Sequence, residues 1–365
     1  MHVYFHVPFC ARRCSYCDFA IAVRRAVPAA RYVDLVLREW GERQEHPGWN
    51  ESPRVRTIYF GGGTPSLLPP DAVAALLQRI RSDRALAPDA EITLEANPDD
   101  VTPMAAGGWR SAGVTRLSVG AQSFQPAVLR WMHRTHDASA IAAAVRTARA
   151  AGFDDVSLDL IFGLPAELQR DWPADLDCAL ALAPEHLSLY GLTTEPRTPL
   201  ARWTDRGLVN AAPEDRYADE YLTAHGALAA AGFEHYEVSN AARAGRRAQH
   251  NSAYWRRAPY LGLGPSAHSS VGPERWWNLR EWAAYARAVE NGGSAVAGRE
   301  RLDSAAIRLE ELYLGLRTLE GVPADRIPTA HAARWTRDGW ARVGEGRVVL
   351  TPDGWLRLDA LVAAV

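Results

Sequence analysis

Residues 2–17 read HVYFHVPFCARRCSYC, a short apolar run that ends in three cysteines. We interpret residues 2–9 as a strand that leads directly into a loop carrying Cys10, Cys14 and Cys17. The C-x3-C-x2-C spacing therefore places three thiols on one short loop. Because four cysteines in 365 residues make no disulfide framework, these clustered thiols predict a metal site in a reducing compartment, the cytoplasm.

Strand-like runs and helical patterns alternate from this loop to about residue 231. The strand-like runs lie at residues 2–9, 55–60, 91–96, 115–120, 156–162 and 187–192. The helical patterns lie at about 28–45, 70–82, 102–112, 137–151, 167–182 and 214–231, and in the first two the apolar residues recur at i, i+3, i+4 and i+7. Six such units predict an α/β fold with a parallel sheet and helical crossovers. Since a closed TIM barrel needs eight units, we expect an open (β/α)6 partial barrel.

Three polar residues sit near the ends of successive predicted strands: Glu95, Gln122 and Asp159. Parallel α/β barrels build their sites at the carboxyl ends of the strands. We therefore expect these side chains to meet in one site above the barrel, although capping or loop solvation would also explain each of them singly.

The pattern changes after about residue 235, where turn-rich and aromatic sequence begins. We predict a (β/α)6 domain over residues 1–234 and a smaller α+β domain over 235–365. The second domain is expected to contain a helix at 304–319 and a β-ribbon with a helix at 340–364.

Charge and hydropathy exclude several classes of function. The 41 basic and 43 acidic residues nearly balance, which argues against a dedicated nucleic-acid binder. All the basic residues are arginine, so no mechanism can use a lysine Schiff base or a P-loop lysine. The sequence contains no run of 18 apolar residues that would predict a membrane span, and its first residues are too polar for a signal peptide.

The three clustered cysteines leave two metal sites open. Three thiolates can hold three irons of a [4Fe–4S] cluster, and the fourth iron would then be free for an exogenous ligand. The alternative is a zinc site completed by His6 or Asp18, although zinc sites favour C-x2-C pairs. Cys178 lies far away on a predicted helix, where we expect it to be a small buried apolar residue.

With the glycine run Gly61–Gly62–Gly63–Thr64–Pro65 after the second predicted strand, the cysteine loop resembles the radical S-adenosylmethionine (SAM) superfamily. The resemblance implies a [4Fe–4S] cluster on Cys10, Cys14 and Cys17. It also implies that SAM chelates the open iron and that the glycines let the backbone approach the methionyl group.

The resemblance narrows to the group of oxygen-independent coproporphyrinogen III oxidases and HemW-type heme chaperones. The stretches that carry it cover nearly the whole chain in order: YFHVPFCARRCSYCDF, YFGGGTPS, ITLEANP, RLSVGAQSF, DLIFGLP, LSLYGLT, EVSN, QHNSAYW, YLGLGPSAHS and LTPDGWLRLDAL.

This resemblance implies roles for individual residues. The positions that correspond to the family's SAM and cluster contacts are Tyr4, Tyr16, Gly62, Gly63, Thr64 and Glu95. The positions that hold a second SAM in the oxidases correspond to Gln122, Arg134 and Asp159.

Two short motifs separate the chaperones from the oxidases. The oxidases carry a further cysteine two residues after the third, where this chain has Phe19. The chaperones carry an H-N-x-x-Y-W signature associated with heme, which matches His250, Tyr254 and Trp255 here. Imidazole is a common iron ligand, and the flanking arginines could pair with heme propionates.

We therefore expect a heme chaperone that passes heme to acceptor hemoproteins such as respiratory enzymes, with possible peripheral contact with membrane proteins. Its cofactors would be a [4Fe–4S] cluster and SAM, and its cargo heme. The alternatives are an oxygen-independent coproporphyrinogen III oxidase and a radical SAM enzyme that modifies heme.

Overall fold

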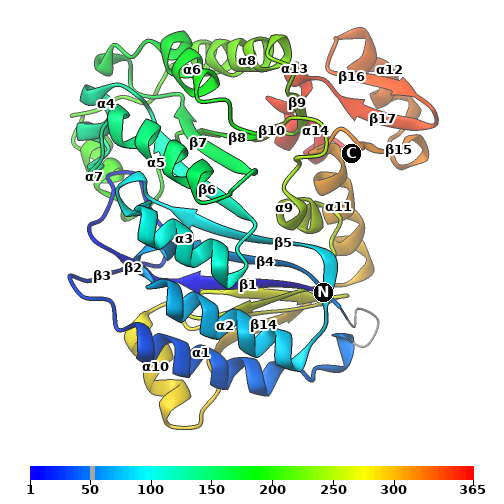
Figure 1. Cartoon of the computed structure of the whole chain (residues 1–365). Helices are drawn as coiled ribbons and strands as arrows, with labels where there is room; N and C mark the ends of the chain where they lie inside the picture. The colour runs from blue at the N-terminus through cyan, green and yellow to red at the C-terminus, as the bar shows by residue number, and fades with distance from the viewer. Residues whose placement is uncertain (50–53) are drawn as a thin grey trace.

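Twelve strands form one sheet in the computed structural model, which describes residues 1–49 and 54–365 (Figure 1). Six parallel strands follow one another across its centre: β1 (His2–Val7), β4 (Val55–Gly62), β5 (Leu86–Ala96), β6 (Arg116–Gln122), β7 (Val156–Phe162) and β8 (His186–Gly191). Each corresponds to a strand predicted from the sequence. The sheet continues beyond both β1 and β8 instead of joining them, so the predicted open barrel is confirmed.

Helices cover the outer face of these strands (Figure 1). Those predicted from the sequence are α1 (Ala29–Arg43), α2 (Pro70–Asp83), α3 (Pro103–Ala112), α5 (Ala138–Ala150), α6 (Trp172–Ala181) and α8 (Glu214–Ala230). Helix α6 begins later than its predicted start at residue 167, because Gln169 has a φ of 47° and the Asp171 side chain caps the amide of Ala174. The short helices α4 (Pro126–Trp131) and α7 (Pro199–Asp205) were not predicted.

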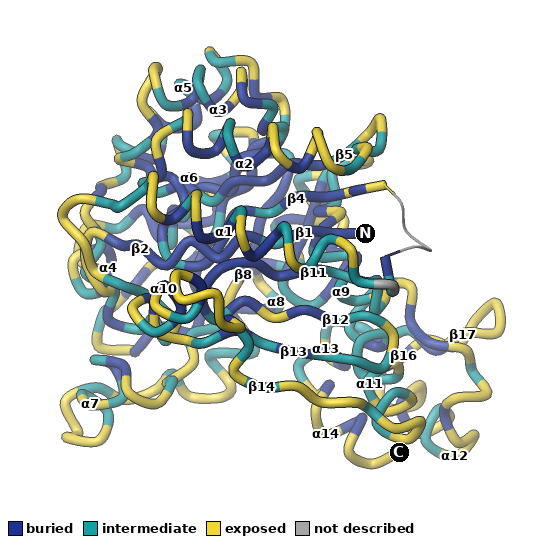
Figure 2. The backbone as a smooth tube through the Cα atoms, turned by 90° about the horizontal axis from the view of Figure 1, so that it is seen from below, coloured by how far each residue is buried: buried dark blue, intermediate teal, exposed yellow. Residues whose placement is uncertain are grey.

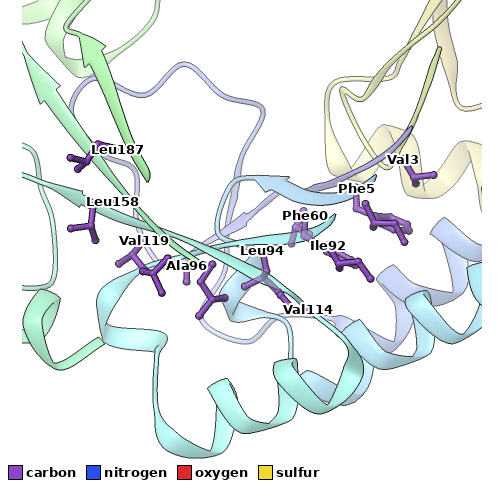
Figure 3. Packing of buried hydrophobic residues seen from close by; sticks show 14 of the residues in the cluster. Val3, Phe5, Phe60, Ile92, Leu94, Ala96, Val114, Val119, Leu158 and Leu187 are labelled. Atoms are coloured by element: carbon purple, nitrogen blue, oxygen red, sulfur yellow. The ribbon is translucent and has the colours of Figure 1, made fainter. Parts of the chain in front are cut away.

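The central strands alternate apolar residues toward the helices with polar residues toward the barrel interior. In β5, for example, Ile92 and Leu94 belong to the hydrophobic core, whereas Thr93 and Glu95 alternate with them. The labelled apolar side chains in Figure 3 come from β1, β4, β5, β6, β7 and β8 and from residues next to them. The barrel interior is consequently a polar column rather than a packed apolar core.

This alternation makes the outward face the main source of stability. Leu158 of β7 is fully buried in the core, and we expect Leu158→Ala to lower the free energy of unfolding by about 2–5 kcal/mol. Leu208 is 66% exposed, so Leu208→Ala is the matched control and should change stability by less than about 0.5 kcal/mol. Urea unfolding of both variants tests this prediction, and equal effects would contradict the assignment of the core.

Segments after residue 234 extend the same sheet at both edges. β9 (Glu234–Glu237) and β10 (Asn240–Ala242) add beyond β8. On the other side, β11 (Tyr260–Leu263) pairs in parallel with β1 and is followed by three antiparallel strands: β12 (His268–Val271), β13 (Glu274–Asn278) and β14 (Val296–Arg301). Figure 2 shows β14 as the exposed edge, with helix α10 (Trp282–Glu290) nearby.

The remaining elements form a smaller unit at the C-terminus, which we call the C-terminal unit. It contains α11 (Ser304–Leu316), a three-stranded sheet in the order β15 (Val322–Pro323), β17 (Arg347–Leu350) and β16 (Ala341–Gly344), and the helices α12 (Thr329–Arg337), α13 (Pro352–Trp355) and α14 (Leu358–Ala363). The helix and the ribbon expected in this region are present. The domain boundary at residue 234 stays a prediction, since the large sheet runs through it.

Candidate cofactor site

The cysteine loop is held in place at both ends and in its middle. Cys10 ends the two-residue strand β2 (Phe9–Cys10), which pairs with β3 (Ala22–Val23) on the far side of the loop. Between them, the amide of Ser15 donates to the carbonyl of Met132, and the carbonyl of Ser15 accepts from the amide of Leu200 at 2.9 Å. The residues after α4 and the start of α7, two helices absent from our prediction, therefore fix the loop.

The three sulfur atoms line one cavity, and two of them accept hydrogen bonds. Thr64 Oγ1 donates to Cys10 Sγ at 3.4 Å, and Arg134 Nη1 donates to Cys14 Sγ at 3.6 Å. Burial raises the pKa of the Cys17 thiol to about 12 and also raises the pKa of Cys10. Thiolates in this loop therefore need positive charge beside them, which a bound metal supplies.

The arrangement disfavours the zinc alternative. Among the described residues, no three His, Cys, Asp or Glu side chains converge as the ligands of a single metal ion. His6, one proposed fourth ligand, directs its Nε2 to the carbonyl of Ala20 at 2.9 Å instead. Three cysteines that share a cavity without converging on one point fit a [4Fe–4S] cluster, in which each cysteine binds its own iron.

The glycine run packs directly against the cysteine loop. A Cβ on Gly63 would lie 2.8 Å from the carbonyl of Phe9, and one on Gly62 would lie 2.6 Å from the His6 ring. Gly62 also has a φ of 108°, a conformation that side chains disfavour. Both positions therefore require glycine if the backbone is to form this wall of the cavity.

Glu95 lies next to the glycine run and is held by two donors. Tyr59 Oη donates to Glu95 Oε1 at 2.8 Å, and the amide of Gly62 donates to Oε2 at 3.2 Å. Burial raises the pKa of Glu95 to about 7, and the nearby Asp159 carboxylate also raises it, while the bond from Tyr59 lowers it. Glu95 can therefore change its charge near neutral pH.

Asp159, Arg134 and Gln122 line the same cavity. Asp159 accepts from Ser118 Oγ at 3.1 Å, and burial raises its pKa. Arg134 Nη2 donates to Asn97 Oδ1 at 2.7 Å, which fixes the guanidinium beside Cys14. Gln122 has a φ of 67°, a conformation uncommon for a residue other than glycine, at a register shift between β6 and β7.

The cavity has a volume of about 450 Å³ at the carboxyl end of the parallel strands. It brings together eleven of the residues predicted from the sequence: Cys10, Cys14, Tyr16, Cys17, Gly62, Gly63, Thr64, Glu95, Gln122, Arg134 and Asp159. A volume of this size suits a small organic cofactor beside a cluster. Tyr4 lies next to this group, with its ring stacked on Tyr59 at 6.1 Å between centroids.

His250 lies elsewhere, at the opposite end of the barrel. It belongs to α9 (Gln249–Trp255), whose first amides donate to the Glu91 carboxylate of β5. His250 is 1% exposed, and its ring nitrogens pair with Thr57 Oγ1 at 2.6 Å and Tyr254 Oη at 2.8 Å. Burial lowers the pKa of His250 well below its ordinary value, so the ring is neutral and already fully hydrogen-bonded.

The structure also corrects one expectation and adds one residue. Cys178 is exposed on α6, so the prediction of a buried residue is wrong: it falls on the solvent side of the helix, beside Asp177. Tyr59, which the sequence did not single out, joins both ends of the barrel, because its ring stacks on His250 at 5.1 Å while its hydroxyl holds Glu95. In TIYFGG, Thr57 and Tyr59 alternate with apolar residues, and this alternation could have placed Tyr59 inside the barrel.

Among the helices that the structure describes, none has the length and apolar character needed to span a bilayer.

Comparisons with known proteins bear on this cavity. A family model described as the radical SAM superfamily matches residues 4–179. A heme chaperone HemW from Mycobacterium tuberculosis (strain ATCC 25618 / H37Rv) is 40% identical over 366 residues, which cover 99% of this chain and 93% of the relative. A heme chaperone HemW from Escherichia coli (strain K12) is 38% identical over 277 residues, 74% of this chain and 70% of the relative.

The solved structure of coproporphyrinogen III oxidase (HemN) from Escherichia coli is similar to this chain with a TM-score of 0.82. It is 23% identical, and the match covers 99% of this chain and 88% of that one. At this level of identity the similarity demonstrates a common fold and leaves the activity to be argued from the site.

Proposed function

The chain belongs to the HemW family of the radical SAM superfamily, and on that premise we propose that it is a heme chaperone, which binds heme and passes it to acceptor hemoproteins. The observation that carries the proposal is the extent of the similarity, since 99% of the chain aligns with a heme chaperone HemW. It includes the region of α9 and the C-terminal unit as well as the cysteine cavity.

Membership of the superfamily implies a [4Fe–4S] cluster and SAM. We propose that Cys10, Cys14 and Cys17 hold the cluster, and that Thr64 and Arg134 donate to two of the sulfurs. A bound cluster would supply an open iron that SAM could chelate.

The walls of the cavity would bind SAM. The backbone of Gly62 and Gly63 allows close approach, the Glu95 carboxylate accepts hydrogen bonds, and Tyr59 orients that carboxylate. Tyr16, which lines the cavity, would contact the cofactor, and Tyr4 would support Tyr59 from behind.

The cargo, its acceptors and its compartment belong to the same proposal. Heme would be delivered to respiratory hemoproteins in the cytoplasm, with peripheral contact where those acceptors lie at a membrane. Thiols that must bind a cluster are compatible with this reducing compartment.

Titration of the purified, cluster-reconstituted protein with heme tests the proposed function. We expect a saturable Soret change that corresponds to about one heme per chain, followed by transfer to an apo-hemoprotein added in excess. Buffer without protein and an unrelated arginine-rich protein of similar size are the controls for nonspecific adsorption. A linear, nonsaturating change would contradict the proposal.

A second candidate function is oxygen-independent oxidation of coproporphyrinogen III. It is favoured by one observation, that Gln122, Arg134 and Asp159 all line the cavity, where they could hold a second SAM. Against it, Phe19 stands where the oxidases carry a further cysteine, and its ring is 59% exposed at the cavity.

An anaerobic assay with SAM, a reductant and coproporphyrinogen III decides between the two. Formation of protoporphyrinogen would support the oxidase, and its absence beside saturable heme binding would support the chaperone. The same assay with heme in place of the porphyrinogen tests the remaining alternative, a radical SAM enzyme that modifies heme.

A further inference from the structure

A second cavity lies between the barrel and the C-terminal unit, far from the cysteine loop in sequence. Its volume is about 460 Å³. One wall comes from the end of α9 and the residues after it, and the other comes from α11 and the segment from β15 to β17. We call it the α9 furrow and define it by Trp255, Arg256, Leu312, Val322, Arg326 and Arg347.

The lining of the α9 furrow is strongly basic. Five arginines line it, at positions 247, 256, 257, 326 and 347, against the two acidic residues Glu311 and Glu320. Arg247, Arg256 and Arg257 are held in ion pairs with glutamates, so the positive charge left for a ligand comes mainly from Arg326 and Arg347. It fits a ligand with more than one anionic group.

Two arginines of the C-terminal unit keep much of their charge available to a ligand. Arg347 donates to the backbone carbonyls of Glu320 and Gly321, and among the described residues no carboxylate forms an ion pair with it. Arg326 reaches Glu311 only at 3.6 Å, and both side chains are nearly half exposed. Since solvent weakens such a pair, Arg326 can exchange it for a carboxylate of a ligand.

The same furrow offers an aromatic and apolar surface. Trp255 lines it, and the guanidinium of Arg317 lies 4.3 Å from the centre of the Trp255 ring. Leu312 and Val322 face the cavity from the C-terminal unit. A ligand that combines two carboxylates with a large planar apolar body matches this surface, because arginine forks bind carboxylates and aromatic rings stack on planar groups.

We infer that the α9 furrow is the heme site, with the propionates bound by Arg326 and Arg347 and the macrocycle packed against Trp255. This inference rests on the proposed function and locates its cargo. It separates the residues of the H-N-x-x-Y-W signature into two groups. Trp255 faces the ligand, whereas His250 and Tyr254 hydrogen-bond to each other at the floor of the barrel and position α9.

His250 is consequently not an iron ligand. Both of its ring nitrogens are hydrogen-bonded, and the ring stacks on Tyr59 within the barrel. Iron coordination by His250 would break these contacts and expose a side chain that is 1% exposed. Recognition through the propionates instead predicts that porphyrin binds whether or not it contains iron.

Arginine variants and modified porphyrins test the inference on cluster-reconstituted, full-length protein. The double variant Arg326→Ala/Arg347→Ala should bind heme roughly 10- to 100-fold more weakly than wild type, because each lost charge-assisted hydrogen bond weakens binding by about tenfold. The double variant Arg337→Ala/Arg342→Ala removes the same charge from exposed positions of the C-terminal unit outside the furrow. It should bind heme like wild type.

Metal-free protoporphyrin IX should bind to wild type with an affinity comparable to that of heme, and its dimethyl ester should lose affinity as the furrow variant does. Wild-type affinity in the furrow variant would overturn the inference, as would equal binding of ester and acid. Failure of metal-free porphyrin to bind, together with loss of heme from a folded His250→Gln variant, would assign the iron to His250 instead. If wild type binds no porphyrin at all, the proposed function itself fails.

Discussion

Cys14→Ser is expected to reduce the iron content of the anaerobically reconstituted protein from about four atoms per chain to nearly none. The loop offers three sulfur ligands, and Cys14 is the one whose sulfur accepts a hydrogen bond from Arg134. Its loss leaves two corners of a cluster without a ligand, and the Arg134 guanidinium then faces a hydroxyl with much weaker acceptor character. Iron and sulfide analysis together with the visible absorption spectrum measures the effect, and SAM binding should be lost with the cluster.

Cys178→Ser is the matched control for this experiment. Cys178 is exposed on α6 and does not line the cavity, so its replacement should leave iron, sulfide and SAM binding unchanged. A Cys14→Ser protein that keeps a full complement of iron would contradict the assignment of the three ligands. One zinc per chain in wild type, in place of iron and sulfide, would revive the alternative metal site.

Local patterns in the sequence were sufficient to predict the barrel, the three cysteines and the polar residues at the strand ends, whereas the glycine, tyrosine and Arg134 positions of the cavity were expected from the family resemblance. Each strand–helix unit carries its own periodicity, and the carboxyl ends of parallel strands meet at one edge by geometry. Glu95, Gln122 and Asp159 could therefore be placed together without knowledge of any long-range contact. The three cysteines required only their spacing along one loop.

Long-range pairings could not be predicted in the same way. β11 joins β1 in parallel although more than 250 residues separate them in the chain, and the four residues of β11 give little periodicity to indicate it. The α9 furrow has a similar origin, because Arg347 reaches Trp255 only through the docking of the C-terminal unit. No local pattern reports that docking.

The motif around His250 shows why the type of a residue does not reveal which way its side chain points. Residues 250 and 254 are four apart, so they share one face of α9, and that face meets the barrel floor. Trp255 falls on the side that lines the furrow. A helix of seven residues is too short for its apolar periodicity to identify the buried face, so the expectation that His250 contacts heme rested on the resemblance of the motif and on imidazole chemistry.

Glu95→Gln is expected to weaken SAM binding to the cluster-loaded protein by roughly 10- to 100-fold, the effect of losing about 1.5–3 kcal/mol from hydrogen bonds to a charged group. In wild type, SAM affinity should rise as pH increases through about 7, because that is where Glu95 ionises. The variant should lose this dependence. Glu195→Gln, which removes a carboxylate from the same cavity, should retain both the affinity and the pH dependence.

The stability of the same variant should move in the opposite direction from its SAM affinity. The pKa of Glu95 is raised from 4.5 to about 7 in the folded protein, so the folded state holds a proton that the unfolded state releases between these pH values. Wild type therefore loses stability as pH rises from 4.5 to 7, and this contribution stays constant above 7. Because glutamine carries no charge, the free energy of unfolding of Glu95→Gln should be about 1–2 kcal/mol higher than that of wild type at pH 8 without SAM. This range allows for partial solvent access to the side chain.

Thermal or urea unfolding at pH 5 and pH 8 measures this difference, which should be smaller at pH 5. A variant that is both less stable and unable to bind SAM would point to damage of the fold instead of the loss of a ligand contact. A variant that gains stability while losing SAM binding would show that the buried Glu95 charge destabilises the fold and is needed to bind the cofactor. That outcome would also explain why Tyr59 and Gly62 are both directed at one carboxylate, since their hydrogen bonds favour the ionised form that SAM requires.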